Sequence, residues 1–246
     1  MIIDMHMHID NVPSLGWEMS AEQCIQAMDD AGVDKAAVMT ITDLPGLNSR
    51  SLELIAEACN SYPGRLYGFI RLNPAYLEES KTLLTEAVTK LGFRGLKLHP
   101  VSSNQHPGGA ATIELIRLAG ELGVPTLFHC GDEPMTTPLS IAPAAAACPD
   151  SLIILGHMGG YFHVEEAIEV AERHPNIILE TSAMPYPEKI RAAVERIGAG
   201  RVIFGSDGPV SSPSLEVQKV TLADLGAEAT GLVLGGNAAK LLGVAA

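Results

Sequence analysis

The sequence alternates between short apolar runs and longer amphipathic runs along its whole length. Apolar runs with the length of buried strands cover 1–8, 34–40, 65–71, 94–98, 124–129, 151–155, 176–180 and 201–204. Runs with helical periodicity lie near 20–31, 49–61, 76–91, 110–122, 138–147, 163–173, 187–198 and 213–224. Because each strand is followed by a helix, the pattern predicts a parallel sheet with the helices packed outside it.

The number of repeats selects between the two common architectures of such a sheet. Eight strand–helix units in 246 residues are typical of a closed (β/α)8 barrel, the TIM-barrel architecture. The alternative, an open doubly wound sheet, would place a glycine-rich phosphate-binding turn after the first strand. His6-Met7-His8 stands there instead. We therefore predict an α/β fold with a single barrel domain over residues 1–246.

Local signals support the expected helix ends. Ser20 followed by Gln23 has the spacing of a capping box at a helix N-terminus. Gly32, Gly92 and Gly123 follow three of the helical runs, at the position where a left-handed residue commonly closes a helix.

Composition and charge exclude several classes of function. The chain is 47% hydrophobic, enough for a large core, and has no apolar stretch of about 18 residues that would span a membrane. The formal charge of −13 disfavours binding to nucleic acid or to an anionic membrane. The N-terminus lacks the features of a signal or transit peptide. Four cysteines without a C-x-x-C pair fit a reducing, cytoplasmic location, and we expect Cys130 to be a buried, inert thiol.

Two closely spaced histidines end the first expected strand. Side chains at i and i+2 share one face of a strand, roughly 6.6 Å apart, so His6 and His8 could bind one metal ion. The opposite, apolar face would then consist of Ile3, Met5, Met7 and Ile9. The competing interpretation is an edge strand whose polar face meets water.

Reactive side chains also stand at the ends of other strands, where a (β/α)8 barrel carries its active site. They are, in chain order, Arg71, Lys97, His99, His129, His157 and Asp207. Any one of them could be a hydrogen-bonded core residue. Because several independent strands end in this way, we predict one common site at the carboxyl end of the barrel. His163 and His174 lie in a helical run and are interpreted as ordinary residues.

This order of residues resembles the amidohydrolase superfamily. H-x-H followed by Lys, His, His and Asp is most similar to the amidohydrolase-related branch that also contains the aminocarboxymuconate-semialdehyde decarboxylase group. The resemblance covers essentially the full length, and 236–243 resembles the closing segment of that branch. It implies a divalent metal ion, with zinc expected, whose ligands are His6, His8, His129 and Asp207.

The resemblance also implies roles for two further residues. His157 would be either a ligand of a second metal ion or a free base that stabilises an oxyanion. Lys97 matches the place where binuclear relatives carry a carboxylated lysine, and the surrounding 95–99 string resembles a strand of urease. An unmodified ammonium would repel a metal ion, so Lys97 is expected to be carboxylated, turned away or paired with an acid. One metal ion is favoured over two.

Zinc lowers the pKa of a bound water molecule to roughly 7. The first expectation is therefore a hydrolase in which zinc-bound water attacks an amide, ester or lactone of a small molecule. Asp207 would accept the water proton, and His157 would stabilise the oxyanion. The alternative is a metal-dependent, non-oxidative decarboxylase of a small carboxylic acid. A barrel deoxyribonuclease is disfavoured because those enzymes carry glutamate where Lys97 stands, and a non-catalytic binding barrel is disfavoured by the complete ligand set.

Substrate contacts and partners are less constrained by the sequence. Arg71 is a candidate clamp for a substrate carboxylate, or else one half of a surface ion pair. His99 is a second candidate substrate contact. The segments 10–19, with Trp17, and 100–109 could form a lid. We expect a small-molecule substrate and, as a default, an isologous homodimer.

Overall fold

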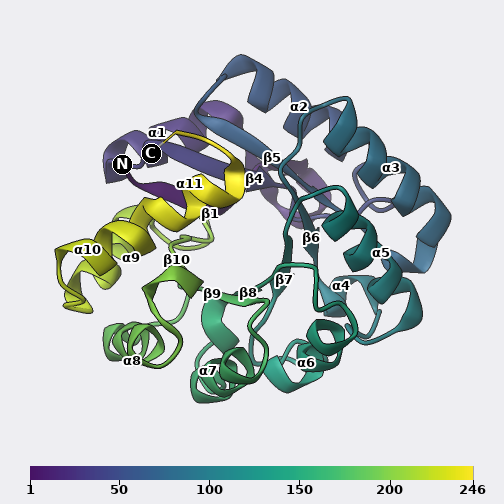
Figure 1. Ribbon diagram of the computed structural model, residues 1–246. Helices are drawn as coiled ribbons and strands as arrows, with labels where there is room; N and C mark the ends of the chain where they lie inside the picture. The colour runs from purple at the N-terminus through teal and green to yellow at the C-terminus, as the bar shows by residue number, and fades with distance from the viewer. Residues whose placement is uncertain (246) are drawn as a thin grey trace.

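The computed structural model describes residues 1–245, and its strands form the predicted barrel (Figure 1). The main sheet consists of β1 (Ile3–His8), β4 (Lys35–Met39), β5 (Leu66–Arg71), β6 (Gly95–Leu98), β7 (Thr126–His129), β8 (Ile153–Gly156), β9 (Ile177–Glu180) and β10 (Val202–Ile203). Every strand of this sheet lies within one residue of a predicted range.

The strands follow chain order around the sheet, from β1 through β4 to β10. Backbone contacts between the last and first strands bring the barrel to closure. The Met5 N–H donates to the Phe204 carbonyl at 3.1 Å, and Met7 forms a parallel bridge with Gly208. The open doubly wound sheet is therefore ruled out, and the (β/α)8 prediction is confirmed.

Helices surround the sheet at the predicted positions (Figure 1). They are α1 (Ala21–Ala31), α2 (Ser51–Ser61), α3 (Leu77–Thr89), α5 (Ala110–Glu121), α6 (Pro138–Ala147), α7 (Val164–Arg173), α8 (Pro187–Ile197) and α9 (Pro213–Leu222). The capping box of Ser20 and Gln23 is present, and Gly32 closes α1 in the left-handed conformation. Gly92 and Gly123 also have positive φ angles.

Two apolar layers hold the barrel together. The outer layer lies between the strands and the helices. The inner layer fills the barrel with Ile3, Met5, Ala37, Met39, Phe69, Leu127, Ile154, Ile178 and Ile203. Gly95 makes room for the ring of Phe69, because a Cβ there would overlap it. The C-terminal helix α11 (Asn237–Leu242) adds Ala238, Ala239 and Leu242 to this layer, so it covers the end at which the strands begin.

The first strand corrects one prediction. The pairing of β1 with β4 shifts by one residue between Asp4 and Met7, which is a β-bulge. As a result, Ile3 and Met5 pack inside the barrel, whereas Met7 packs in the outer layer. The single apolar face expected for β1 is therefore wrong. The bulge interrupts the alternation, so that Met5 and the two histidines of β1 all face the interior.

Segments between the repeats form short elements that the sequence pattern did not indicate. The 10–19 segment is a hairpin of β2 (Asp10–Val12) and β3 (Trp17–Met19). A short helix, α4 (Pro100–Ser103), begins the 100–109 segment, and α10 (Ala227–Gly231) and a π-helical turn (Leu232–Gly236) precede α11. Turns of 3-10 helix lie at Pro13–Leu15, Pro74–Tyr76, His157–Gly159 and Ala199–Arg201. Among residues 1–245, no helix is long and apolar enough to cross a membrane.

Candidate metal centre

The end of β1 and the loop after β10 bring three potential metal ligands together. His6 and His8 come from β1, and Asp207 follows β10. Asp207 Oδ1 lies 3.2 Å from His8 Nε2 and 3.5 Å from His6 Nε2. Their ligand atoms all lie within 4.8 Å of one another, and both histidines are buried. We call these three residues the ligand triad.

The spacing and charge of the ligand triad fit a metal ion. Ligands about 2.0–2.2 Å from a tetrahedral ion stand roughly 3.3–3.6 Å apart, close to the two separations above. Burial lowers the pKa of His6 and of His8, which favours neutral imidazoles. Burial alone would raise the pKa of Asp207, but the hydrogen bond from His8 and the nearby His6 and His157 hold it well below its usual value. Neutral imidazoles and an ionised carboxylate are the forms that bind metal.

The backbone at the site is unusual in two places. Asp207 has a φ of 59° and His157 a φ of 63°, in the left-handed region that is uncommon outside glycine. The Asp207 N–H donates to the His6 carbonyl at 2.7 Å, which fastens the loop after β10 to β1. The turn that begins at His157 continues with a second left-handed residue, Met158. Such conformations cluster at functional sites, where the surrounding structure maintains them.

Three further histidines extend the site beyond the ligand triad. His157 Nε2 lies 3.1 Å from His129 Nδ1, and the ring of His99 stacks on His129 with centroids 4.0 Å apart. His129 Nε2 lies 3.2 Å from Glu133 Oε2. Burial lowers the pKa of His157 to about 3, so this ring is neutral at pH 7. The structure thus places His129 beside His157 and outside the triad, and its predicted ligation of a metal ion stays a prediction.

Lys97 lies inside the barrel next to the triad. Its Nζ is 2.7 Å from His6 Nε2. Burial, together with the nearby Arg71, lowers the pKa of Lys97 to about 7. The unmodified side chain is therefore neither turned away nor paired with an acid, two of the outcomes considered from the sequence. Above about pH 7 the amine is mostly neutral and carries no charge that would repel a metal ion.

Glu180 belongs to the site, and the sequence pattern did not reveal it. It ends β9 with no exposed surface, and its Oε2 lies 2.9 Å from His6 Nδ1. Ser182 Oγ donates to the same carboxylate at 2.9 Å and lies 2.8 Å from His157 Nδ1. The available signal was a carboxylate at the end of the apolar run 177–180. That signal is weak, because an acidic residue after such a run is also typical of a solvated loop.

Arg71 ends β5 and lies in the interior. Its Nε donates to Asp43 Oδ1 at 2.6 Å and its Nη2 to Ser102 Oγ at 2.9 Å. Arg71 is 5% exposed and Asp43 is 8% exposed. The surface ion pair considered from the sequence is therefore a buried pair in which Asp43 balances the charge of Arg71. Contact of Arg71 or of His99 with a substrate stays a prediction.

Asp4 and Cys130, which border the site in sequence, are structural residues, as expected for Cys130. Asp4 Oδ1 accepts hydrogen bonds from the His6 and Ser206 N–H groups, both at 2.9 Å, and so stabilises the bulge in β1. Cys130 is fully buried, and burial raises the pKa of its thiol. A thiol in this state is inert.

A family model agrees with this arrangement. The model described as Amidohydrolase matches residues 3–244, nearly the whole chain. The chain belongs to the amidohydrolase family. This confirms the resemblance drawn from the strand-end residues. No curated protein matches the sequence of this amidohydrolase.

Solved structures share the fold of the amidohydrolase over nearly its full length. An uncharacterised TIM-barrel protein from Bordetella bronchiseptica is 21% identical with a TM-score of 0.83, and 98% of each chain is covered. A 2,6-dihydroxybenzoate decarboxylase, complexed with 2,6-dihydroxybenzoate, is 16% identical with a TM-score of 0.76 and 99% of each chain covered. A 5-carboxyvanillate decarboxylase from Novosphingobium aromaticivorans, complexed with manganese and 4-hydroxy-3-methoxy-5-nitrobenzoic acid, is 16% identical with a TM-score of 0.80. The alignment covers 99% of this chain and 96% of that one. At these identities the likeness establishes the fold.

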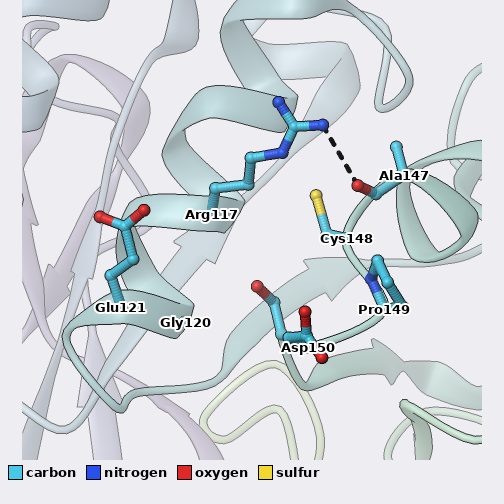
Figure 2. A pocket seen from close by; sticks show the side chains of 8 residues that line it. Arg117, Gly120, Glu121, Ala147, Cys148, Pro149 and Asp150 are labelled. Carbon is cyan, nitrogen blue, oxygen red and sulfur yellow. Dashed lines mark hydrogen bonds between the residues drawn. The ribbon is translucent and has the colours of Figure 1, made fainter.

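A pocket of about 320 Å³ lies at the opposite end of the amidohydrolase barrel (Figure 2). It forms where α5 and α6 end, next to the start of β8. Arg117 Nη2 donates to the Ala147 carbonyl at 3.2 Å beside the thiol of Cys148 (Figure 2). Burial raises the pKa of that thiol. Because the strands begin here, this pocket is separate from the ligand triad at their carboxyl ends.

Proposed function

We propose that this protein is a metal-dependent decarboxylase that removes CO2, without an oxidant, from a small hydroxylated aromatic acid. The observation that carries the proposal is the ligand triad of His6, His8 and Asp207, next to a hydrogen bond between two further histidines, His157 and His129. Membership of the amidohydrolase family supports an enzymatic role for this site. The decarboxylases among the structures of similar fold favour decarboxylation over the hydrolysis expected first.

The ligand triad would hold one divalent cation. Manganese is the metal in two of the decarboxylases of similar fold, so Mn²⁺ joins Zn²⁺ as a candidate. Bound there, the cation would polarise the oxygen atoms of the substrate and neutralise its carboxylate. His129, the fourth ligand expected from the sequence, has another role in this proposal, because binding to the cation would break its contact with Glu133 or with His157.

Decarboxylation breaks a carbon–carbon bond and leaves its electron pair on the ring carbon, which must then take a proton. His157 and His129 share one proton between Nε2 and Nδ1, and this proton is the proposed source. Glu133, whose side chain is 52% exposed, contacts the other side of His129. The series Glu133, His129 and His157 thus connects solvent to the interior and can replace the proton after each turnover.

Hydrolysis is the second candidate, because the same triad would suit it. It requires a group that accepts a proton from water, the role first expected of Asp207. Burial raises the pKa of Asp207, but the hydrogen bond with His8 and its other histidine neighbours hold this pKa well below its usual value. Hydrolysis takes second place because the structures of similar fold named above include decarboxylases.

The direct test is CO2 release by protein loaded with Mn²⁺ or with Zn²⁺. The substrates are 2,6-dihydroxybenzoate, 5-carboxyvanillate and related hydroxylated benzoates, and a parallel panel contains amides, esters and lactones. We expect CO2 from at least one acid, and a loss of roughly 100-fold or more in rate for His157→Gln. His163→Gln, a change at the half-buried residue that precedes α7, is the matched control. Hydrolysis of an amide, ester or lactone without CO2 release from any acid would overturn the proposal.

A further inference from the structure

Glu180 is a buried carboxylate that reaches two separate parts of the site. Its Oε2 lies 2.9 Å from His6 Nδ1, 2.9 Å from Ser182 Oγ and 3.3 Å from the His157 backbone nitrogen. Its other oxygen, Oε1, accepts the backbone N–H of Ser182. The side chain has no exposed surface, so it contacts the site from behind rather than from the side that a substrate enters.

The two flanking strands leave space for this carboxylate. Gly205 follows β10, and a Cβ added there would overlap Glu180 Oε1 and lie 3.0 Å from His6 Cβ. Gly156 ends β8, and a Cβ added there would lie 3.5 Å from Glu180 Oε2. Absence of a side chain on both sides of Glu180 allows it to sit between His6 and His157 at the centre of the barrel.

The hydrogen bonds of Glu180 determine which nitrogen of His6 carries its proton. A carboxylate only accepts, so His6 Nδ1 must donate to it. In the neutral ring the lone pair is then on Nε2, which lies 2.7 Å from Lys97 Nζ and 3.5 Å from Asp207 Oδ1. This is the tautomer with which His6 can bind a metal ion.

The same reasoning extends to His157 through Ser182. The Ser182 hydroxyl uses its single proton to donate to Glu180, so it accepts from His157 Nδ1–H. The lone pair of His157 then lies on Nε2, the nitrogen that faces His129 Nδ1. One carboxylate therefore specifies the tautomers of a predicted metal ligand and of the predicted proton carrier.

We propose that Glu180 is a positioning residue that orients His6 for metal binding and, through Ser182, His157 for proton transfer. The inference rests on the proposed metal-dependent function. It assigns no contact with substrate to Glu180. Substitution of such a partner of a metal ligand typically weakens metal binding 10- to 100-fold.

The test uses ¹⁵N-histidine NMR of the metal-free protein, which identifies the protonated nitrogen of each ring, together with titration by Mn²⁺ and by Zn²⁺. In the unsubstituted protein we expect His6 and His157 to carry their protons on Nδ1. Glu180→Gln should change both tautomers and weaken metal binding about 10- to 100-fold. Ser182→Ala, the milder matched variant, should change only His157 and leave metal affinity within about twofold. It also tests the proposal if Glu180→Gln does not fold.

Two results separate this inference from the proposed function. If Glu180→Gln keeps the Nδ1–H tautomers and the original metal affinity, the inference is overturned while the function stands. If the unsubstituted protein binds neither metal, the proposed function fails. The NMR comparison still decides whether Glu180 sets the two tautomers.

Discussion

At the scale of single residues, burial determines the chemistry of the site. Burial lowers the pKa values of His6, His8 and His157 and so makes the rings neutral. The residues found from the sequence were those whose type is rare at strand ends, the histidines above all. Glu180 was missed because an acidic residue at the end of an apolar run is also typical of a solvated loop, and only the fold shows that it is buried against His6.

The buried pair of Arg71 and Asp43 leads to a prediction about stability. Asp43→Ala should lower the free energy of unfolding by roughly 3–5 kcal/mol, because it leaves the guanidinium of Arg71 buried without a counter-charge. Urea unfolding followed by circular dichroism measures this change. Glu57→Ala removes a partner from the exposed pair with Arg50 and should cost less than about 1 kcal/mol. Equal effects of the two changes would contradict the account of Arg71.

At the scale of elements, the sequence predicted where strands and helices lie but not how irregular some of them are. The bulge in β1 was not foreseen, because the residues on both sides of it keep the same alternation of apolar and polar types. The 10–19 hairpin and α4 are too short for their periodicity to be recognised. The helix ends were predictable since they depend on local chemistry, as at Ser20 and Gly32.

Gly32 provides a test of that local chemistry. Its φ is 68°, and no atom lies within 4 Å of the position of an added Cβ. Gly32→Ala should therefore lower the free energy of unfolding by about 1 kcal/mol through backbone strain alone, without affecting metal binding. Gly200→Ala is the matched control, because Gly200 also has open space but not a left-handed backbone. Thermal unfolding of both variants is the measurement, and an unchanged Gly32→Ala protein would refute the capping role.

At the scale of the whole molecule, the repeat of strand and helix was enough to predict the barrel and the end that carries the site. Strand ends converge in any closed barrel, so residues such as His8 and Asp207, 199 positions apart, could be assigned to one site from the sequence. What the repeat could not give was the side-chain geometry within that site. His129 illustrates the limit: its position was predicted, but its contacts with His157 and Glu133 depend on loop shape.

The most direct test of the central claim is the metal content of the purified protein, measured by inductively coupled plasma mass spectrometry together with native intact mass. We predict one equivalent of divalent metal per chain, and its loss in the His6→Ala/His8→Ala variant. The control variant His163→Ala, at a half-buried residue outside the site, should keep the metal. A His6→Ala/His8→Ala protein that is folded and retains its full metal content would contradict the account.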